Sequence, residues 1–431
     1  MNSDIPKHSI GKNWAKNYQY QARRLYQPDT TDQVRELIQQ SNHMRVLGSR
    51  HSFNGIADCE HDLLSLANIN DVIQLDEEKR QATVGGGMNY GELAVYLQDK
   101  GYALHNLASL PHISIPGACA TATHGSGIHN GNLATAVSAM EIVTANGNLV
   151  TFSAKKNEEA FKGAVVGLGG LGAVVAITLD IKPTYKVKQN VYLDLSAKHL
   201  EQHFDDIMSS GYSVSFFTDW RNETINQVWI KEQVEEGNTT QAEPTLFDAA
   251  LADKNMHPID GVSAEHCTPQ LGIPGPWHQR LPHFRMDFTP SAGEELQSEF
   301  FVPREHAYEA MKKLFALGDQ ITPHLLTSEI RTIAGDNLWM SPCYKRPSVA
   351  FHFTWKQKPK AVKKILPVIE ETLAPYEVRP HWGKVFTMNA LTIASRYPKI
   401  AHFKELLMQY DPNGKFRNSY LQKYIFASYE Q

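Results

Sequence analysis

Three glycine-rich turns between residues 48 and 127 constrain the fold of this chain more than any other feature. The first follows a short apolar run, residues 44–47, which predicts a buried strand that stops at Gly48. The second, residues 85–87, precedes a predicted helix, whose N-terminus would attract an anion such as a pyrophosphate. The third, residues 121–127, is rich in small side chains and hydroxyl groups. Each turn alone fits an ordinary loop, but three within one domain favour a nucleotide cradle, because small side chains let backbone amides approach a ligand closely.

His51 follows the first of these turns, three residues after Gly48. An imidazole is a good nucleophile near neutral pH, so a histidine presented by a glycine turn at a strand end suits the attachment of a cofactor. The alternative is a polar turn whose histidine only hydrogen-bonds its neighbours, and the motif alone favours that alternative. Together with the other two turns, it predicts a cofactor attachment point at His51.

A further glycine-rich stretch, residues 167–172, matches the GxGxxG pattern of dinucleotide-binding proteins. That pattern binds a pyrophosphate only where it connects a strand to a helix. Here residues 173–179 follow, and their β-branched side chains predict a strand. The sequence therefore argues against NAD binding through this motif.

Composition excludes several classes of partner. The 431 residues predict two or three domains, and the net charge of -4 argues against a nucleic-acid partner. The N-terminus holds no apolar signal segment, and the uncharged apolar run of residues 163–179 is short for a membrane span. The four cysteines form no CxxC pair, so neither a zinc site nor a disulfide framework is indicated. We expect a cytoplasmic monomer without metal, nucleic-acid partner or membrane contact.

Polar side chains alternate with apolar ones on two predicted strands of the second half. Glu329 and Arg331 share one face of the first, and His352 and Thr354 share one face of the second, because side chains alternate along a strand. If the strands are neighbours, these four groups converge, and Lys384 adds another basic group. From the sequence alone, the alternative of a solvent-facing strand with an ordinary surface ion pair has equal support. The converging groups would suit a hydroxyl-rich substrate.

The rest of the chain predicts a mixed fold. Residues 236–283, rich in proline, glycine and histidine, predict a long irregular connection, and such loops are often functional. Helices are predicted at residues 28–42, 200–208, 305–317 and 361–373, and strands at 81–84, 214–220, 227–231, 326–333 and 348–355.

Several motifs together carry a family resemblance that spans nearly the whole chain. In the first half they are residues 48–55, 108–112, 122–127 and 169–172. In the second half they are residues 274–277, 301–304, 328–332, 350–355 and 381–384. With these motifs the chain resembles the flavoprotein oxidases of the vanillyl-alcohol oxidase type, and its second half resembles the alditol oxidases of that family.

The resemblance implies an α+β fold. Residues 1–185, completed by 385–431, would form an FAD-binding domain of two subdomains, and residues 186–384 a substrate-binding domain with a large antiparallel sheet flanked by helices. FAD would be bound covalently to His51, and Ala108 would leave space for oxygen. The other residues implied to bind FAD are Gly48, Ser49, Arg50, Ser52, Ser109, Ala118, Thr121, His124, Gly125, Ser126 and Val175.

The implied activity is oxidation of the terminal C1 hydroxyl of alditols such as xylitol and sorbitol to the aldose. Hydride would pass to flavin N5, and reoxidation by O2 would give hydrogen peroxide. The implied substrate pocket is Ser109, Glu329, Arg331, His352, Thr354 and Lys384, with Arg331, Lys384 and His352 acting in catalysis. The alternatives are an aldonolactone oxidase or dehydrogenase of the same family, and a non-enzymatic sugar-binding relative.

Overall fold

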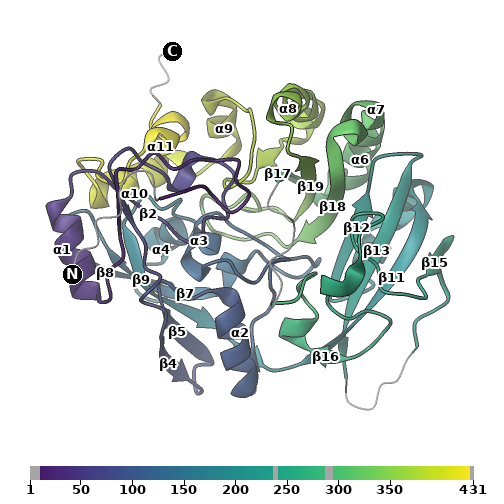
Figure 1. The fold of residues 1–431 in the computed structure, drawn as a ribbon, viewed down its shortest axis with the longest axis horizontal. Coiled ribbons are helices and arrows are strands. Elements are labelled where there is room, and N and C mark those ends of the chain that lie inside the picture. Colours follow the sequence, from purple (N-terminus) through teal and green to yellow (C-terminus); the bar gives the residue numbers. More distant parts are fainter. Residues whose placement is uncertain (1–9, 236–240, 287–294, 428–431) are drawn as a thin grey trace.

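The computed structural model describes residues 10–235, 241–286 and 295–427. In these residues the strands form sheets of three, two, five and ten strands. The N-terminal segments and the C-terminal helices lie on one side of the molecule, and the strands of the large sheet lie on the other (Figure 1).

A small parallel sheet opens the chain. Its strand order is β1 (Arg24–Tyr26), β3 (Asp62–Leu64) and β2 (Met44–Val46). Helix α1 (Thr31–Gln40) begins after Thr30, whose side chain accepts a hydrogen bond from the Gln33 amide over 3.3 Å. The predicted strand before Gly48 and the predicted helix within residues 28–42 are both confirmed.

An antiparallel five-stranded sheet follows. Its strand order is β4 (Val72–Asp76), β5 (Gln81–Gly85), β9 (Ala173–Asp180), β7 (Val137–Val143) and β8 (Leu149–Ser153). Strand β9 directly follows Gly172, so the structure confirms that the GxGxxG stretch leads into a strand. Helices α2 (Tyr90–Asp99), α3 (Ile115–Ala120) and α4 (Glu158–Val165) and the two-stranded pair of β6 (Tyr102–Ala103) and β10 (Lys182–Pro183) complete this half.

The glycines of residues 85–87 serve packing. A Cβ on Gly86 would lie 1.9 Å from the carbonyl oxygen of Val174, and one on Gly87 would lie 2.0 Å from that of Leu66. These contacts require glycine, because the neighbouring backbone leaves no room for a side chain. The turn is therefore a close backbone approach between strands.

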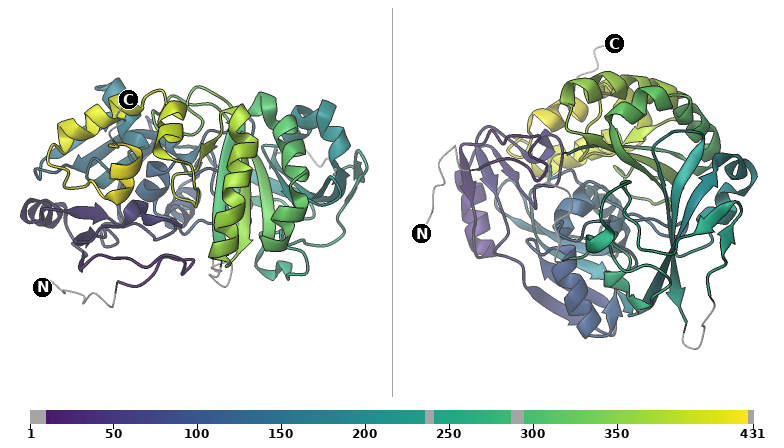
Figure 2. Two further views of the ribbon diagram at one scale, coloured as in Figure 1. Left: turned by 90° about the horizontal axis from the view of Figure 1, so that it is seen from above. Right: turned by 45° about the vertical axis from the view of Figure 1, so that its right-hand side comes forward.

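The large sheet dominates the second half. Its strand order is β14 (Thr245–Leu246), β15 (Ala249–Leu251), β11 (Lys186–Ser196), β13 (Thr224–Val234), β12 (Ser213–Thr218), β18 (Leu325–Ile333), β19 (Ser348–Lys356), β17 (Glu295–Pro303) and β20 (Arg379–Pro380), with β16 (Gly275–Pro276) paired to β11. All its pairings are antiparallel. Helices cover one face (Figure 2): α5 (Leu200–Met208), α6 (Ala307–Phe315), α7 (Gly318–Ile321) and α8 (Pro359–Leu373).

The C-terminal helices return to the N-terminal half. They are α9 (Ala390–Arg396), α10 (Ile400–Tyr410) and α11 (Ser419–Tyr424). Asn418 donates to the carbonyl oxygens of Ile56 and Asp58 over 3.1 and 2.7 Å, and the buried Arg45 guanidinium donates to the Phe416 carbonyl over 2.8 Å. These bonds fix the last helices beside the segment that carries His51.

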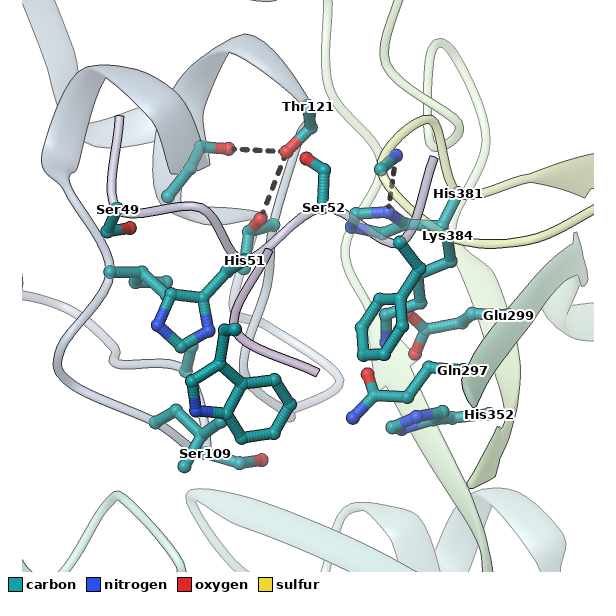
Figure 3. A pocket seen from close by; sticks show the side chains of 18 of the residues that line it. Ser49, His51, Ser52, Ser109, Thr121, Gln297, Glu299, His352, His381 and Lys384 are labelled. Carbon is teal, nitrogen blue, oxygen red and sulfur yellow. Dashed lines mark hydrogen bonds and ion pairs between the residues drawn. The ribbon is translucent and has the colours of Figure 1, made fainter. Parts of the chain in front are cut away.

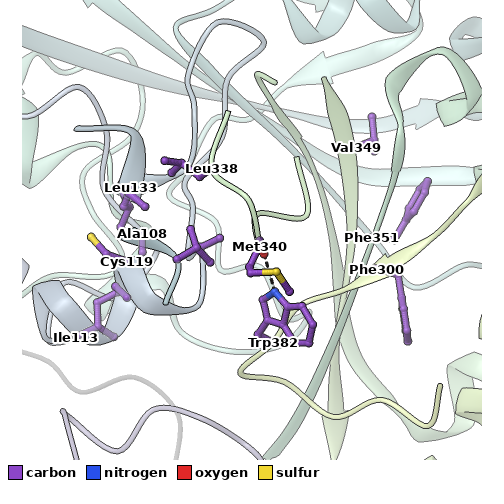
Figure 4. Close-up of a cluster of buried hydrophobic side chains, with 14 of the residues drawn as sticks. Ala108, Ile113, Cys119, Leu133, Phe300, Leu338, Met340, Val349, Phe351 and Trp382 are labelled. Carbon is purple, nitrogen blue, oxygen red and sulfur yellow. Dashed lines mark hydrogen bonds between the residues drawn. The ribbon is translucent and has the colours of Figure 1, made fainter. Parts of the chain in front are cut away.

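One large cluster of buried apolar side chains joins the two halves. It includes Val84 and Ile177 of the five-stranded sheet and Phe351 of the large sheet. Within it, Trp382 is fully buried and donates from Nε1 to the Met340 carbonyl over 2.7 Å (Figure 4). This bond anchors the backbone next to Lys384. No helix in the described part of the chain has the length and apolar character needed to cross a membrane.

Candidate active site

A cavity of about 780 Å³ lies between the first and third glycine-rich turns and the large sheet. Its volume falls in the range of small-molecule and cofactor sites. His51 and Ser109 lie on one side, and Gln297, Glu299 and His352 lie opposite (Figure 3). The predicted site residues that line it are Gly48, Ser49, Arg50, His51, Ser52, Ala108, Ser109, Ala118, Thr121, His124, Glu329, Arg331, His352, Thr354 and Lys384.

The two sides of this cavity are held together by the backbone around His51 and Lys384. Asn54 donates from Nδ2 to the carbonyl oxygens of Trp382 and Lys384, each over 2.8 Å. The Phe53 amide donates to the Gly383 carbonyl over 2.7 Å. These hydrogen bonds hold the first glycine turn next to the segment that brings Lys384 into the site.

The first glycine turn packs closely against the segment at Ser114. A Cβ on Gly48 would lie 2.5 Å from Ser114 Oγ, and Ser49 Oγ accepts a hydrogen bond from the Ser114 amide over 3.0 Å. Arg50 adopts a left-handed backbone with φ of 63°, which is uncommon for a residue other than glycine. The turn therefore brings backbone to the cavity wall and aims His51 along it.

His51 stacks on Trp14, with ring centroids 5.2 Å apart and an interplanar angle of 25°. Burial, with a smaller contribution from His112, lowers the pKa of His51 to about 4. The imidazole is therefore neutral at pH 7, and only the neutral ring has the lone pair that a nucleophile needs. A neutral, cavity-lining histidine beside small residues fits the attachment of FAD, as does a cavity of this size.

Three predicted cofactor residues do not line the cavity: Gly125, Ser126 and Val175. Ser126 donates from Oγ to the Val214 carbonyl, and a Cβ on Gly125 would lie 2.5 Å from both Asn106 Oδ1 and the Leu107 carbonyl. Val175 is buried within β9. The turn at residues 85–87 is also outside the lining. Of the three glycine-rich turns from which a nucleotide cradle was predicted, two line the cavity.

The predicted convergence on the large sheet is confirmed. Strands β18 and β19 pair directly, with Glu329 opposite His352. Glu329 and Arg331 are each only 5% exposed, which contradicts the alternative of a solvent-facing ion pair. Thr354 is also buried and lines the same cavity. Charged groups this deeply buried must be paired, so their partners define the chemistry of the site.

Glu299, which the sequence analysis missed, lies at the centre of these partners. Its Oε1 is 2.6 Å from Arg331 Nη2 and 3.2 Å from His124 Nε2, and its Oε2 is 2.8 Å from Lys384 Nζ. Strand β17 places it opposite His352 in β19. In the sequence, Glu299 is the one charged residue within 296–302, and this isolated carboxylate could have drawn attention to it. Glu299 therefore joins the two cations predicted to act in catalysis.

The electrostatics of this cluster follow from burial and pairing. Burial alone would raise the pKa of Glu299, but Lys384, His124 and Arg331 together hold it well below its usual range. Burial lowers the pKa of Lys384, and the adjacent Glu299 charge opposes that fall. Glu299 is therefore ionised and helps to keep Lys384 charged.

His352 and Arg331 present polar atoms without partners among the described residues. Neither ring nitrogen of His352 has a hydrogen-bond partner, and Arg331 Nε has none. Burial, together with Lys384, lowers the pKa of His352 to about 4, so its ring is neutral at pH 7. Unpartnered buried polar atoms are costly, so this constellation is suited to a polar ligand with several hydroxyl groups.

Two other side chains of the cavity wall were not predicted. His283 Nε2 lies 2.8 Å from Glu329 Oε1, and His381 stacks on Phe301 with ring centroids 6.3 Å apart. His283 comes from the irregular segment predicted at residues 236–283, part of which, residues 236–240, lies outside the described residues. Nothing in the local pattern of that segment distinguished His283 from its other histidines.

Two family models match the chain: an FAD binding domain over residues 22–153, and D-arabinono-1,4-lactone oxidase over residues 292–424. The alditol oxidase of a Streptomyces species is 44% identical over 413 residues, covering 95% of this chain and 97% of the relative. The L-gulonolactone oxidase of Bos taurus is 27% identical and covers 96% and 98%.

A solved structure supports the same fold. The cholesterol oxidase from B. sterolicum aligns with a TM-score of 0.76 at 13% identity, over 99% of this chain and 97% of that one. With the FAD-binding match, this confirms the predicted α+β fold with a large antiparallel sheet. The chain therefore belongs to the family of FAD-dependent oxidoreductases of the vanillyl-alcohol oxidase type that includes the Streptomyces alditol oxidase.

Proposed function

We propose that this protein oxidises the terminal hydroxyl of alditols such as xylitol and sorbitol, with FAD as cofactor and O2 as the final electron acceptor. The observation that carries the proposal is the cluster of Glu329, Arg331, His352 and Lys384 on the cavity wall that His51 also lines, in which the carboxylate and the guanidinium are buried. The 44% identity to an alditol oxidase supports the substrate class. Aldose and hydrogen peroxide would be the products.

The cavity side near residues 48–52 and 108–124 would hold the flavin, and His51 would bind it covalently. When bound, FAD supplies a hydride acceptor and then reduces oxygen. The low pKa of His51 supports this role, because the neutral ring is the nucleophile. Residues 1–185 with 385–431 would form the FAD-binding domain, and residues 186–384 the substrate-binding domain.

On the opposite side, Arg331 and Lys384 would hold the C1 hydroxyl of the substrate. Both are cationic, and they are 6% and 14% exposed as side chains, so they are largely shielded from water, where charge stabilisation is strong. They would stabilise negative charge that develops on the C1 oxygen. The unpartnered nitrogens of His352 and the hydroxyl groups of Thr354 and Ser109 would bind the remaining hydroxyls.

A second candidate is oxidation of an aldonolactone. The match of residues 292–424 to a D-arabinono-1,4-lactone oxidase model favours it, since that range contains Glu299, Glu329, Arg331, His352 and Lys384. The 27% identity to an L-gulonolactone oxidase is lower than the identity to the alditol oxidase, so the alditol is preferred.

The test combines a spectrum with a turnover assay. Purified protein should be yellow, keep its flavin after acid precipitation, and release peroxide with xylitol or sorbitol. His51→Ala should leave any bound flavin in the acid supernatant. A colourless wild-type protein would contradict the proposal. Peroxide with L-gulono-1,4-lactone but not with either polyol would establish the second candidate, and reduction of an added dye without peroxide would identify a dehydrogenase.

A further inference from the structure

Lys231 is a buried cation behind the site. It lies in β13, is 1% exposed, and its Nζ is surrounded by three acceptors. These are the carbonyl oxygens of Leu281 at 2.5 Å and Pro282 at 3.3 Å, and Nδ1 of His283 at 3.2 Å. An ammonium group has three donors and no acceptor. The surroundings therefore match the charged lysine, with one donor for each acceptor.

The Lys231 ammonium fixes the tautomer of His283. Because an ammonium can only donate, Nδ1 of His283 is the acceptor, and the proton of the neutral ring is on Nε2. Nε2 lies 2.8 Å from Glu329 Oε1 and donates to it. Phe217 and Trp229 contact the ring edge-on, with centroids at 5.4 and 5.1 Å, and hold its plane.

This bond engages only one oxygen of Glu329. The other, Oε2, is 3.6 Å from Arg331 Nε and 3.9 Å from His352 Nδ1, which are beyond hydrogen-bond distance. Oε2 is thus the carboxylate atom left to accept a hydrogen bond inside the cavity. It stands next to the unpartnered nitrogens of His352.

We propose that Lys231 and His283 are positioning residues for Glu329: the buried ammonium keeps the imidazole in the tautomer that donates to Oε1, and this holds Oε2 ready to accept a hydroxyl of the substrate. The inference rests on the proposed function, since it requires a hydroxyl-bearing substrate in the cavity. Neither residue touches the reacting carbon in this scheme, so both act on substrate affinity through Glu329.

The charges around His283 agree with this arrangement. Burial lowers the pKa of His283 to about 4, and Lys231 adds to the effect while Glu329 opposes it. Burial lowers the pKa of Lys231 to about 7, and the Glu329 charge opposes that fall. Burial therefore keeps His283 neutral, with Lys231 adding to the effect, and a neutral His283 leaves the negative charge of Glu329 available to Arg331 and to the substrate.

The first test compares two replacements of His283. His283→Leu removes the donor to Glu329, whereas His283→Gln retains an N–H donor on a side chain of similar reach. In the holoenzyme, His283→Leu should raise the KM for xylitol about tenfold, because a hydrogen bond to a charged group is lost, and should leave the limiting rate of flavin reduction within about twofold. His283→Gln should recover most of the affinity.

The matched control is Thr268→Val. Thr268 Oγ1 donates over 2.7 Å to the Pro282 carbonyl, which also accepts from Lys231, so this variant loosens the same loop and leaves the side chains of Lys231, His283 and Glu329 in place. It should lower thermal stability and leave the KM for xylitol unchanged. An equal rise of KM in Thr268→Val and His283→Leu would overturn the proposal in favour of simple loop packing, as would an unchanged KM in His283→Leu.

The second test does not depend on turnover. Nitrogen-15 NMR of histidine-labelled holoprotein at pH 6, below the pKa of about 7 of Lys231, should show His283 as the neutral tautomer protonated at Nε2. Lys231→Met removes the charge that adds to burial in lowering the pKa of His283, so a pH titration of the same resonances should give a higher pKa than in the wild type. A ring protonated at Nδ1 in the wild type, or an unchanged pKa of His283 in Lys231→Met, would refute the chain. If wild-type protein oxidises no alditol, the proposed function fails and this measurement still decides the geometry.

Discussion

Replacing Glu299 by glutamine should move the pH dependence of flavin reduction to lower pH. In the wild type the carboxylate lies 2.8 Å from Lys384 Nζ and opposes the effect of burial on the pKa of that lysine. Glutamine keeps the size and an acceptor but removes the charge. The pKa of Lys384 therefore falls, and the lysine loses its proton at a pH where the wild-type group is still charged.

The size of the shift follows from the geometry. Opposite charges about 4 Å apart attract by about 4 kcal/mol at an effective dielectric constant of about 20. That energy corresponds to roughly 3 pKa units. Glu299 also pairs with Arg331 and lies 3.2 Å from His124, and the Arg331 charge offsets part of its effect on Lys384. The expected fall is therefore about 1 to 3 units.

The assay is stopped-flow reduction of the enzyme flavin by xylitol across a pH series. The reduction rate should decline as pH rises through the pKa of Lys384, because only the ammonium stabilises negative charge on the C1 oxygen. In Glu299→Gln this decline should begin at lower pH. Glu299→Asp is the matched control, since it keeps the charge on a shorter side chain and should keep the decline near its wild-type position.

An alkaline decline at the same pH in Glu299→Gln and the wild type would refute the reasoning. It would show either that Lys384 does not control the reduction rate or that Glu299 does not control the protonation of Lys384. Thermal unfolding separates this result from misfolding. Removing one partner of a buried ion pair destabilises a protein by about 3–5 kcal/mol, so the variant should melt earlier and still bind flavin.

Three further variants test individual roles. Lys384→Met should slow flavin reduction about a hundredfold, equivalent to about 3 kcal/mol of lost charge stabilisation, with xylitol and with glycerol alike, and rapid-reaction kinetics would measure it. Thr354→Ala should mainly raise the apparent KM in steady-state assays, because it removes one neutral hydrogen bond worth about 1 kcal/mol. The rise should be larger for xylitol than for the shorter glycerol. Ala108→Leu should slow reoxidation of the reduced enzyme by oxygen more than it slows reduction by substrate, and unchanged reoxidation traces would count against an oxygen path at this residue.

Local patterns were sufficient to predict four side chains of the polar cluster. The alternation of Glu329 with Arg331, and of His352 with Thr354, places each pair on one face of a strand, and that period is a property of the backbone itself. The same reasoning identified β9 as a strand after the GxGxxG stretch, because its β-branched residues outweigh the resemblance to a dinucleotide motif.

The missed residues depend on contacts between distant segments. Glu299 meets Arg331 and Lys384 only because β17, β18 and the turn after β20 come together in three dimensions. His283 belongs to an irregular segment without periodicity, so the sequence pattern could not predict which way its side chain points. The turn at residues 85–87 misled for the opposite reason: its glycines are required by strand packing, and sequence alone does not separate packing from ligand approach.

The two carboxylates explain how such a site can hold two cations away from water. Arg331 and Lys384 would be costly to bury alone, and Glu299 and Glu329 balance them charge for charge. A bound alditol is neutral, so it leaves that balance unchanged. As negative charge develops on the C1 oxygen, it competes with Glu299 for donors that are already in place and charged. Stabilisation is therefore greater in the transition state than in the bound substrate, which is the condition for accelerating the chemical step.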